Sequence, residues 1–156
     1  ATRPRRRRSR RRTSCTGCAV ERPETKARAR ALQLLYAWDL SGHPSIDTVV
    51  TRLARTYGEI PEGYDRGAEL AARAVAGQEE YDAQLSRLSE HWRLERVGVV
   101  EKNILRLAMA ELDEGRTPAR VVMDEAVKLA HWFGGGRSPA FVNGVLDAVA
   151  RELGRL

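Results

Sequence analysis

Apolar residues recur at intervals of three and four along most of the chain beyond residue 23, and no segment alternates apolar and polar residues with a period of two. Residues three and four apart lie on one face of a helix, so each apolar stripe indicates an amphipathic helix with one buried side. The pattern therefore predicts an all-α fold, a compact bundle of about seven helices without a sheet.

Short breaks rich in Gly, Pro and Ser separate the expected helices. The predicted helices span residues 24–40, 46–57, two segments of 64–91 that meet near Gly77, 97–112, and two more that follow Thr117-Pro118 and Ser138-Pro139. In these last two, Thr or Ser is expected to cap the helix, with Pro at its first position. The stripe expected to be buried after Pro118 comprises Val122, Ala126, Leu129, Ala130 and Phe133.

The last helix contains the dipeptide Asn143-Gly144, which is ordinarily a turn signal, in the middle of an apolar stripe. Glycine inside a helix costs about 1 kcal/mol relative to alanine, so Gly144 is expected to let another backbone approach closely. Asn143 is expected to be a buried amide that bonds a neighbouring loop or helix end. A tolerated polar residue at the edge of the stripe is the alternative.

Charge divides the chain into two parts. Eight of the 27 basic residues are arginines within the first twelve positions, and the remainder has 19 basic and 21 acidic residues, a net charge of −2. A run of like charges repels itself and does not fold alone. Residues 1–22 are therefore predicted to be a disordered basic tail, either bound to nucleic acid or solvated, and residues 23–156 to be the folded domain.

Several classes of function are disfavoured. No apolar run approaches the roughly 20 residues of a membrane span, and no signal peptide is evident, so the protein is expected to be cytoplasmic without a membrane partner. Cys15 and Cys18 form a lone CxxC without further ligands, which predicts neither a metal site nor a cofactor. The adjacent carboxylates diverge by about 100° on a helix, and no nucleotide-binding or nucleophile motif is present, so no enzyme is predicted.

Three segments resemble the NusB family of transcription antitermination factors. "RARALQLLYAWDL" is similar to the family's first helix, "VVEKNILRLAMAEL" to its fifth, and "VVMDEAVKLAHWFGGGRSPAFVNGVLDAVA" to its C-terminal signature, in the expected order. The resemblance implies a compact helical RNA-binding domain over residues 23–156. It also implies pairing with NusE, a small-subunit ribosomal protein, binding to the single-stranded boxA element of rRNA leaders, and action within an RNA polymerase antitermination complex.

The same resemblance implies roles for individual residues. Lys26, Arg28, Arg30 and Gln33 match the family's RNA-contacting first helix, and Arg137, in a glycine-rich loop before the last helix, is a second candidate contact. Tyr36 and Glu101 match positions that contact NusE. Arg106 and Glu111 match strongly but lie five residues apart, so they are expected to be structural ion-pair members that join neighbouring helices, and Glu125 is likewise assigned a structural role.

Two alternative functions remain open from the sequence. One is a helical adaptor that binds only protein. The other is a NusB-like RNA-binding domain related to those fused to rRNA cytosine-5 methyltransferases, although Gly144 and Asp147 are more typical of the standalone family.

Overall fold

The computed structural model describes residues 22–60, 62–88 and 96–156. The predicted tail, apart from Arg22, lies outside the described residues, as do Cys15 and Cys18.

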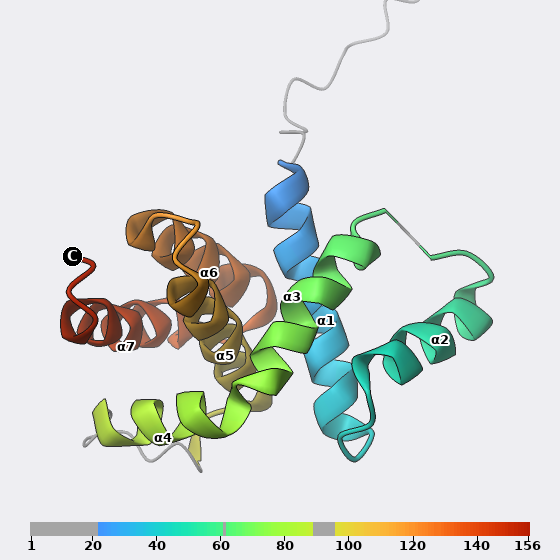
Figure 1. Ribbon diagram of the computed structural model, residues 1–156, viewed down its shortest axis with the longest axis horizontal. Coiled ribbons are helices and arrows are strands. Elements are labelled where there is room, and N and C mark those ends of the chain that lie inside the picture. The colour runs from blue at the N-terminus through green and yellow to red at the C-terminus, as the bar shows by residue number, and fades with distance from the viewer. Residues whose placement is uncertain (1–21, 61, 89–95) are drawn as a thin grey trace, which may run out of the picture.

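The described residues form seven helices and no strand (Figure 1). The helices are α1 (Pro23–Leu40), α2 (Ile46–Tyr57), α3 (Tyr64–Ala76), α4 (Gln78–Leu88), α5 (Val99–Glu114), α6 (Ala119–Phe133) and α7 (Ser138–Glu152). The all-α prediction is confirmed. None of the described helices combines the length and the apolar character needed to cross a bilayer.

Helices α1 and α3 pack against each other in the middle of the molecule, with α2 on one side and α5, α6 and α7 on the other (Figure 1). Helix α5 also contacts both central helices, and ten consecutive residues of it, 103–112, are buried. The core includes most of the apolar residues expected to be buried in α1, α5 and α7, although Phe141 of α7 is only partly buried. Its largest fully buried apolar side chains are Leu34, Leu35, Leu85, Ile104, Leu105, Leu107, Leu112, Leu146, Val122, Val142 and Val149.

The two expected caps before α6 and α7 are wrong. Pro118 occupies the cap position of α6, so Thr117 lies one residue before the cap, and the helix start has no side-chain capping hydrogen bond. Ser138 is the first residue of α7, and its hydroxyl donates a hydrogen bond to the carboxylate of Glu101 in α5. A hydrogen bond to an ionised acceptor is stronger than one to a neutral group, so this hydroxyl joins two helices rather than capping its own.

The structure corrects the expectations for Asn143 and Gly144. Both residues are exposed, and a Cβ atom added to Gly144 would meet no heavy atom within 4 Å. Each helical residue turns about 100°, so position 144 lies opposite the buried stripe that contains Val142 and Leu146, and position 143 lies at its edge. The close helix crossing occurs instead at Gly67, where a Cβ would lie 2.9 Å from Cβ of Arg30 in α1.

Candidate nucleic-acid interface

Helix α1 is buried around most of its circumference and keeps one open strip. Eight of its residues are buried, among them Ala31, Leu35 and Trp38. Beyond the first turn, and apart from Asp39, the half-buried or exposed residues recur at intervals of three and four, which places them on one face. This strip consists of Lys26, Ala29, Arg30, Gln33, Tyr36, Ala37 and Leu40.

The N-terminal half of the strip lines a groove whose opposite side is the end of α6. We call this the α1/α6 groove; it has a volume of about 330 Å³ and is lined by Lys26, Ala29, Arg30, Gln33, Trp132 and Phe133. Trp132 and Phe133 are 47% and 40% exposed. The groove therefore combines two cationic side chains, an amide and two exposed aromatic rings, which are the groups that hold phosphates and stack on bases.

Phe133 was expected in the buried stripe of α6, and this expectation is wrong. It is the last residue of α6, and the chain turns away at Gly134 towards α7. A Cβ at Gly134 would lie 2.6 Å from Cβ of Ser138 and 2.7 Å from the carbonyl oxygen of Ala130, so this turn is tight. The tight turn leaves the end of α6 uncovered. No binding role was predicted from the sequence for Trp132 or Phe133, although adjacent aromatic residues at a helix end close to Arg137 were the available clue.

The side chains of the groove are held in place by contacts among α1 and α3. The Arg30 guanidinium donates to Oε1 of Gln33 at 3.0 Å and lies over the ring of Tyr64, 5.0 Å from its centroid. The Tyr64 hydroxyl donates to the same Gln33 oxygen at 2.9 Å. Nζ of Lys26 lies 3.3 Å from the carboxylate of Glu62, a strongly exposed residue. The carboxylate of Glu62 would therefore compete with RNA phosphates for the Lys26 ammonium group.

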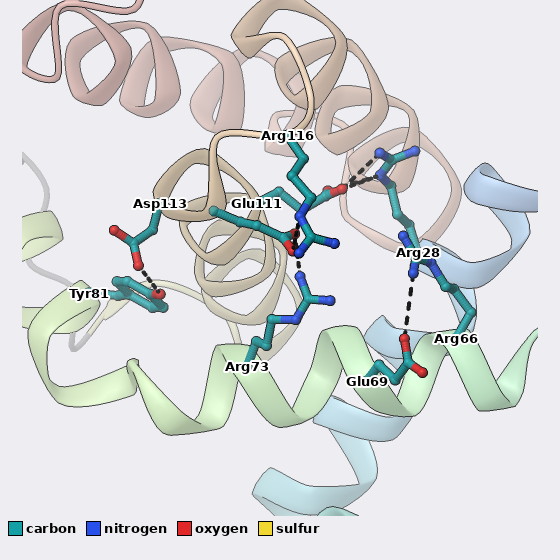
Figure 2. Close-up of polar contacts among 9 residues, drawn as sticks. Arg28, Arg66, Glu69, Arg73, Tyr81, Glu111, Asp113 and Arg116 are labelled. Atoms are coloured by element: carbon teal, nitrogen blue, oxygen red, sulfur yellow. Dashed lines mark hydrogen bonds and ion pairs between the residues drawn. The ribbon is translucent and has the colours of Figure 1, made fainter.

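Arg28 does not belong to this face, which corrects its predicted RNA contact. The residue is only 7% exposed, and its guanidinium donates to both carboxylate oxygens of Glu111 at 2.7 to 3.1 Å. Figure 2 shows Arg28 directed from α1 towards Glu111 on α5. A second carboxylate, that of Glu125 in α6, lies 3.5 Å from Nη1. Arg28 therefore joins three helices in the interior, and its donors are directed at protein carboxylates rather than at RNA.

In the cluster of Arg28, Glu111 and Glu125, the effect of opposite charges and hydrogen bonds on the pKa values exceeds the effect of burial. Burial by itself lowers the pKa of Arg28, but the hydrogen bonds and charge of Glu111, together with the charges of Glu125 and Glu24, raise the pKa above its ordinary value. Burial likewise raises the pKa of Glu125, but hydrogen bonds from Lys128 and Thr25 and the charges of Lys128 and Arg28 hold the pKa below its ordinary value. Arg28 and Glu125 are therefore both charged at neutral pH.

Arg106 anchors a second polar cluster between α1, α4 and α5. Its guanidinium forms two hydrogen bonds with Asp82 at 2.6 and 2.9 Å and lies 3.6 Å from Asp39. It also donates to Asn103 at 3.1 Å and lies over the ring of Trp38, 5.9 Å from the centroid. Arg106 thus pairs with acids of α1 and α4, and Glu111 pairs with Arg28 of α1, so each joins α5 to neighbouring helices as expected.

A third set of salt bridges ties α3 to the end of α5. Glu114 contacts Arg73 of α3 and also Arg116, whose Nε lies 3.1 Å away. Tyr81 of α4 donates to Asp113 at 3.4 Å on the same side. Burial, followed by the charge of Asp113 and this hydrogen bond, raises the pKa of Tyr81. These residues fix the positions of α3, α4 and α5 relative to one another.

The remaining predicted site residues, in α1, α5 and the α6–α7 turn, are exposed or half-buried. Tyr36 is 43% exposed on the open strip of α1, beyond Gln33, with exposed Leu40 one turn further on. Arg137 is exposed in the α6–α7 turn, four residues after Phe133, and no ion pair involves it in the described part of the chain. Glu101 is half-buried, and its carboxylate accepts the hydrogen bond from Ser138.

Fold and surface together define a small all-α protein with an open groove of basic and aromatic side chains at the junction of its first and sixth helices. Among the described residues, no group of three or more His, Cys, Asp or Glu side chains is arranged to hold a metal ion. Residues 25–151 match the model of the NusB family. The chain belongs to the NusB family.

Individual relatives agree with this assignment. The transcription antitermination protein NusB of Solibacter usitatus (strain Ellin6076) is 44% identical over 129 residues, covering 82% of this chain and 88% of that protein. The structure of T. maritima NusB is 28% identical with a TM-score of 0.72, and the match covers 85% of this chain and 93% of that one. A structure of the antitermination factors NusB and NusE in complex with dsRNA matches with 30% identity and a TM-score of 0.69, over 83% of this chain and 97% of that one.

Proposed function

We propose that this protein is a transcription antitermination factor that pairs with NusE and binds a boxA-type single strand of nascent rRNA leaders as part of an RNA polymerase antitermination complex. The observation that carries the proposal is the α1/α6 groove, which places Lys26 and Arg30 beside Trp132 and Phe133 on a member of this family. A relative's structure contains NusB, NusE and RNA together.

Exposed aromatic rings favour a single strand over a duplex. The bases of an A-form duplex are stacked, and its deep major groove is closed to side chains, so rings such as those of Trp132 and Phe133 have no base face to meet. Unpaired bases can leave the stack and lie on them. The relative in complex with dsRNA makes the duplex a necessary competitor in the test.

NusE is assigned to the other half of the open strip. Tyr36 and Leu40 lie four residues apart, so they share a face and present exposed apolar surface beyond the groove. Such side chains are typical anchors of protein interfaces. Partner and RNA would then contact adjoining parts of one helix, so binding of one is expected to support binding of the other. Glu101 is the second proposed contact, through the part of its carboxylate not engaged by Ser138.

Fluorescence anisotropy tests the RNA part of this proposal. A labelled boxA-type single strand, a scrambled strand and the corresponding duplex are titrated with the protein, with and without NusE. We expect the boxA-type strand to bind most tightly, and more tightly when NusE is present. Equal binding of all three would overturn the proposal. Binding of NusE without any binding of RNA would support the adaptor alternative instead.

Two arginine variants locate the contact. Arg137→Glu replaces an exposed arginine, four residues after Phe133 of the groove, with an acid. It should weaken RNA binding, because a phosphate attraction becomes a repulsion. Arg120→Glu is the matched control, since Arg120 is also exposed but lies at the start of α6, about 20 Å along the helix from the groove. If both variants bind RNA alike, the α6–α7 turn is not part of the interface.

Tyr36→Ala and Glu101→Lys test the partner surface. Each should weaken NusE binding in pull-down or calorimetry while the helical circular dichroism signal is retained. Normal NusE binding by both variants would place the interface on another face of the molecule.

A further inference from the structure

The amide of Gln33 is locked in one orientation. Its Oε1 atom accepts one hydrogen bond from Arg30 and another from Tyr64, at 3.0 and 2.9 Å. A guanidinium has only donors, so the Gln33 atom that faces Arg30 must be the oxygen rather than the nitrogen. Both lone pairs of this oxygen are occupied, and the amide cannot flip without breaking both bonds.

The locked amide leaves its nitrogen as the group available to a ligand. Within the described residues, Nε2 of Gln33 has no hydrogen-bond partner, and Gln33 lines the α1/α6 groove. At this position the groove therefore offers two N–H donors and no acceptor.

The rest of the groove suits one flat, unstacked ring. Its volume of about 330 Å³ is at the lower end of the roughly 300–1,000 Å³ usual for small-ligand pockets. Trp132 and Phe133 supply exposed aromatic surface on one side, and Ala29 contributes only a methyl group on the other. Stacking on aromatic side chains tolerates all four bases, so it supplies affinity without choosing among them.

We propose that the groove holds one extruded base of the bound RNA strand, and that Gln33 selects a base with a carbonyl oxygen and discriminates against adenine. This inference rests on the proposed RNA-binding function. Uracil, cytosine and guanine each present a carbonyl oxygen that can accept from Nε2. Adenine has no carbonyl oxygen and accepts only through its ring nitrogens, and N1 and N7 each lie beside the amino group, a donor that needs an acceptor. The usual bidentate pairing of glutamine with adenine supplies the amide oxygen as that acceptor. Here that oxygen is already occupied by Arg30 and Tyr64.

Homopolymeric RNA octamers provide the test. Labelled U8, C8 and A8 are titrated with the full chain, with NusE present, and the ratio of dissociation constants for A8 and U8 is measured. We expect U8 and C8 to bind about three- to tenfold more tightly than A8, the effect of one hydrogen bond. Adenine stacks well on aromatic rings, so stacking alone does not produce this order.

Three variants separate base selection from binding in general. Gln33→Met removes the donors at similar side-chain length and should bring the A8/U8 ratio close to one. Tyr64→Phe frees one lone pair of Oε1 and should lower the ratio by improving A8 binding, with U8 binding unchanged. Trp132→Ala, at an exposed position, should weaken all octamers and keep the ratio.

The outcomes distinguish base selection from RNA binding as such. If wild-type protein binds no octamer and no boxA-type strand, the proposed function fails and this inference with it. If it binds RNA with an A8/U8 ratio near one, or if Gln33→Met and Tyr64→Phe leave the ratio unchanged, the base selection is overturned and the RNA-binding function stands. Circular dichroism melting of each variant confirms that a changed ratio comes from folded protein.

Discussion

At the scale of single residues, three basic side chains at alternate positions of α1 lie in different environments. Lys26 and Arg30 lie on the open strip of α1, whereas Arg28 points into the bundle and meets two buried carboxylates. Two helical positions correspond to a turn of about 200°, so alternate residues cannot share a face. The same residue type is therefore available to RNA at position 30 and serves interior packing at position 28.

Arg28→Met is expected to destabilise the protein by about 3–5 kcal/mol, because it leaves Glu111 and Glu125 buried without their common cation. Arg30→Met, on the groove, should change stability by about 1 kcal/mol or less and instead weaken RNA binding. Urea denaturation and RNA titration of the two variants check this contrast. Equal losses of stability in the two variants would mean that the interior ion pairs of Arg28 contribute no more to the free energy of unfolding than the surface contacts of Arg30.

Glu125→Gln is expected to be less stable than wild type at pH 7, with the difference shrinking in acid. The pKa of Glu125 is held below its ordinary value in the folded protein, so the unfolded chain binds a proton more readily. Its stabilising contribution is therefore complete above the unfolded pKa of about 4.3 and is lost as the pH falls through the lower folded pKa. Urea unfolding at a series of pH values from about 7 to about 3 measures this. Glu59→Gln, at an exposed carboxylate, is the control and should show a smaller difference throughout.

At the scale of helices, α1 organises both the core and the candidate interfaces. Helices α2, α3 and α5 pack against it, and α6 reaches it at the groove, so only one strip stays open. The crossing with α3 is close enough that Gly67 has no room for a side chain, since a Cβ would lie 3.0 Å from the carbonyl oxygen of Ala27. This crossing also holds Tyr64, at the start of α3, within reach of Gln33.

Two glycine variants test the importance of this crossing. Gly67→Ala should destabilise the protein by about 1–3 kcal/mol through overpacking against α1. Gly144→Ala, at an exposed helical position with open space around it, should stabilise by up to about 1 kcal/mol through better helix propensity. Thermal melting of both variants gives the signs. A stable Gly67→Ala protein would show that the α1–α3 crossing can widen without cost.

At the scale of the whole molecule, the positive charge is unevenly distributed. The chain carries a net charge of +6, yet residues 13–156 sum to −2. The folded part is therefore expected to attract RNA through local groups such as Lys26, Arg30 and Arg137 rather than through its overall field. The first twelve residues would supply the long-range attraction.

Deletion of residues 1–12 is expected to reduce the salt dependence of RNA binding. Each phosphate that the tail no longer neutralises should flatten the slope of log affinity against log salt by about 0.7 on a single strand. Titrations of the full chain and the shortened chain between low and moderate salt measure the two slopes. Identical slopes would show that the eight arginines do not bind phosphates.

The order of residues along the chain was sufficient to predict the seven helices, their approximate ends, most of the buried stripes and the family, because helical periodicity and short motifs are local properties. The resemblance to the family also singled out Lys26, Arg30 and Gln33, whose spacing of three and four residues puts them on one helix face. Periodicity shows which residues share a face but not which neighbouring helix covers it. The pairing of Arg28 with Glu111, 83 positions away, and the exposure of Phe133 beside α1 therefore became visible only in the packed bundle. The close helix contact expected at Gly144 likewise occurs at Gly67, because its position depends on which helices cross and where.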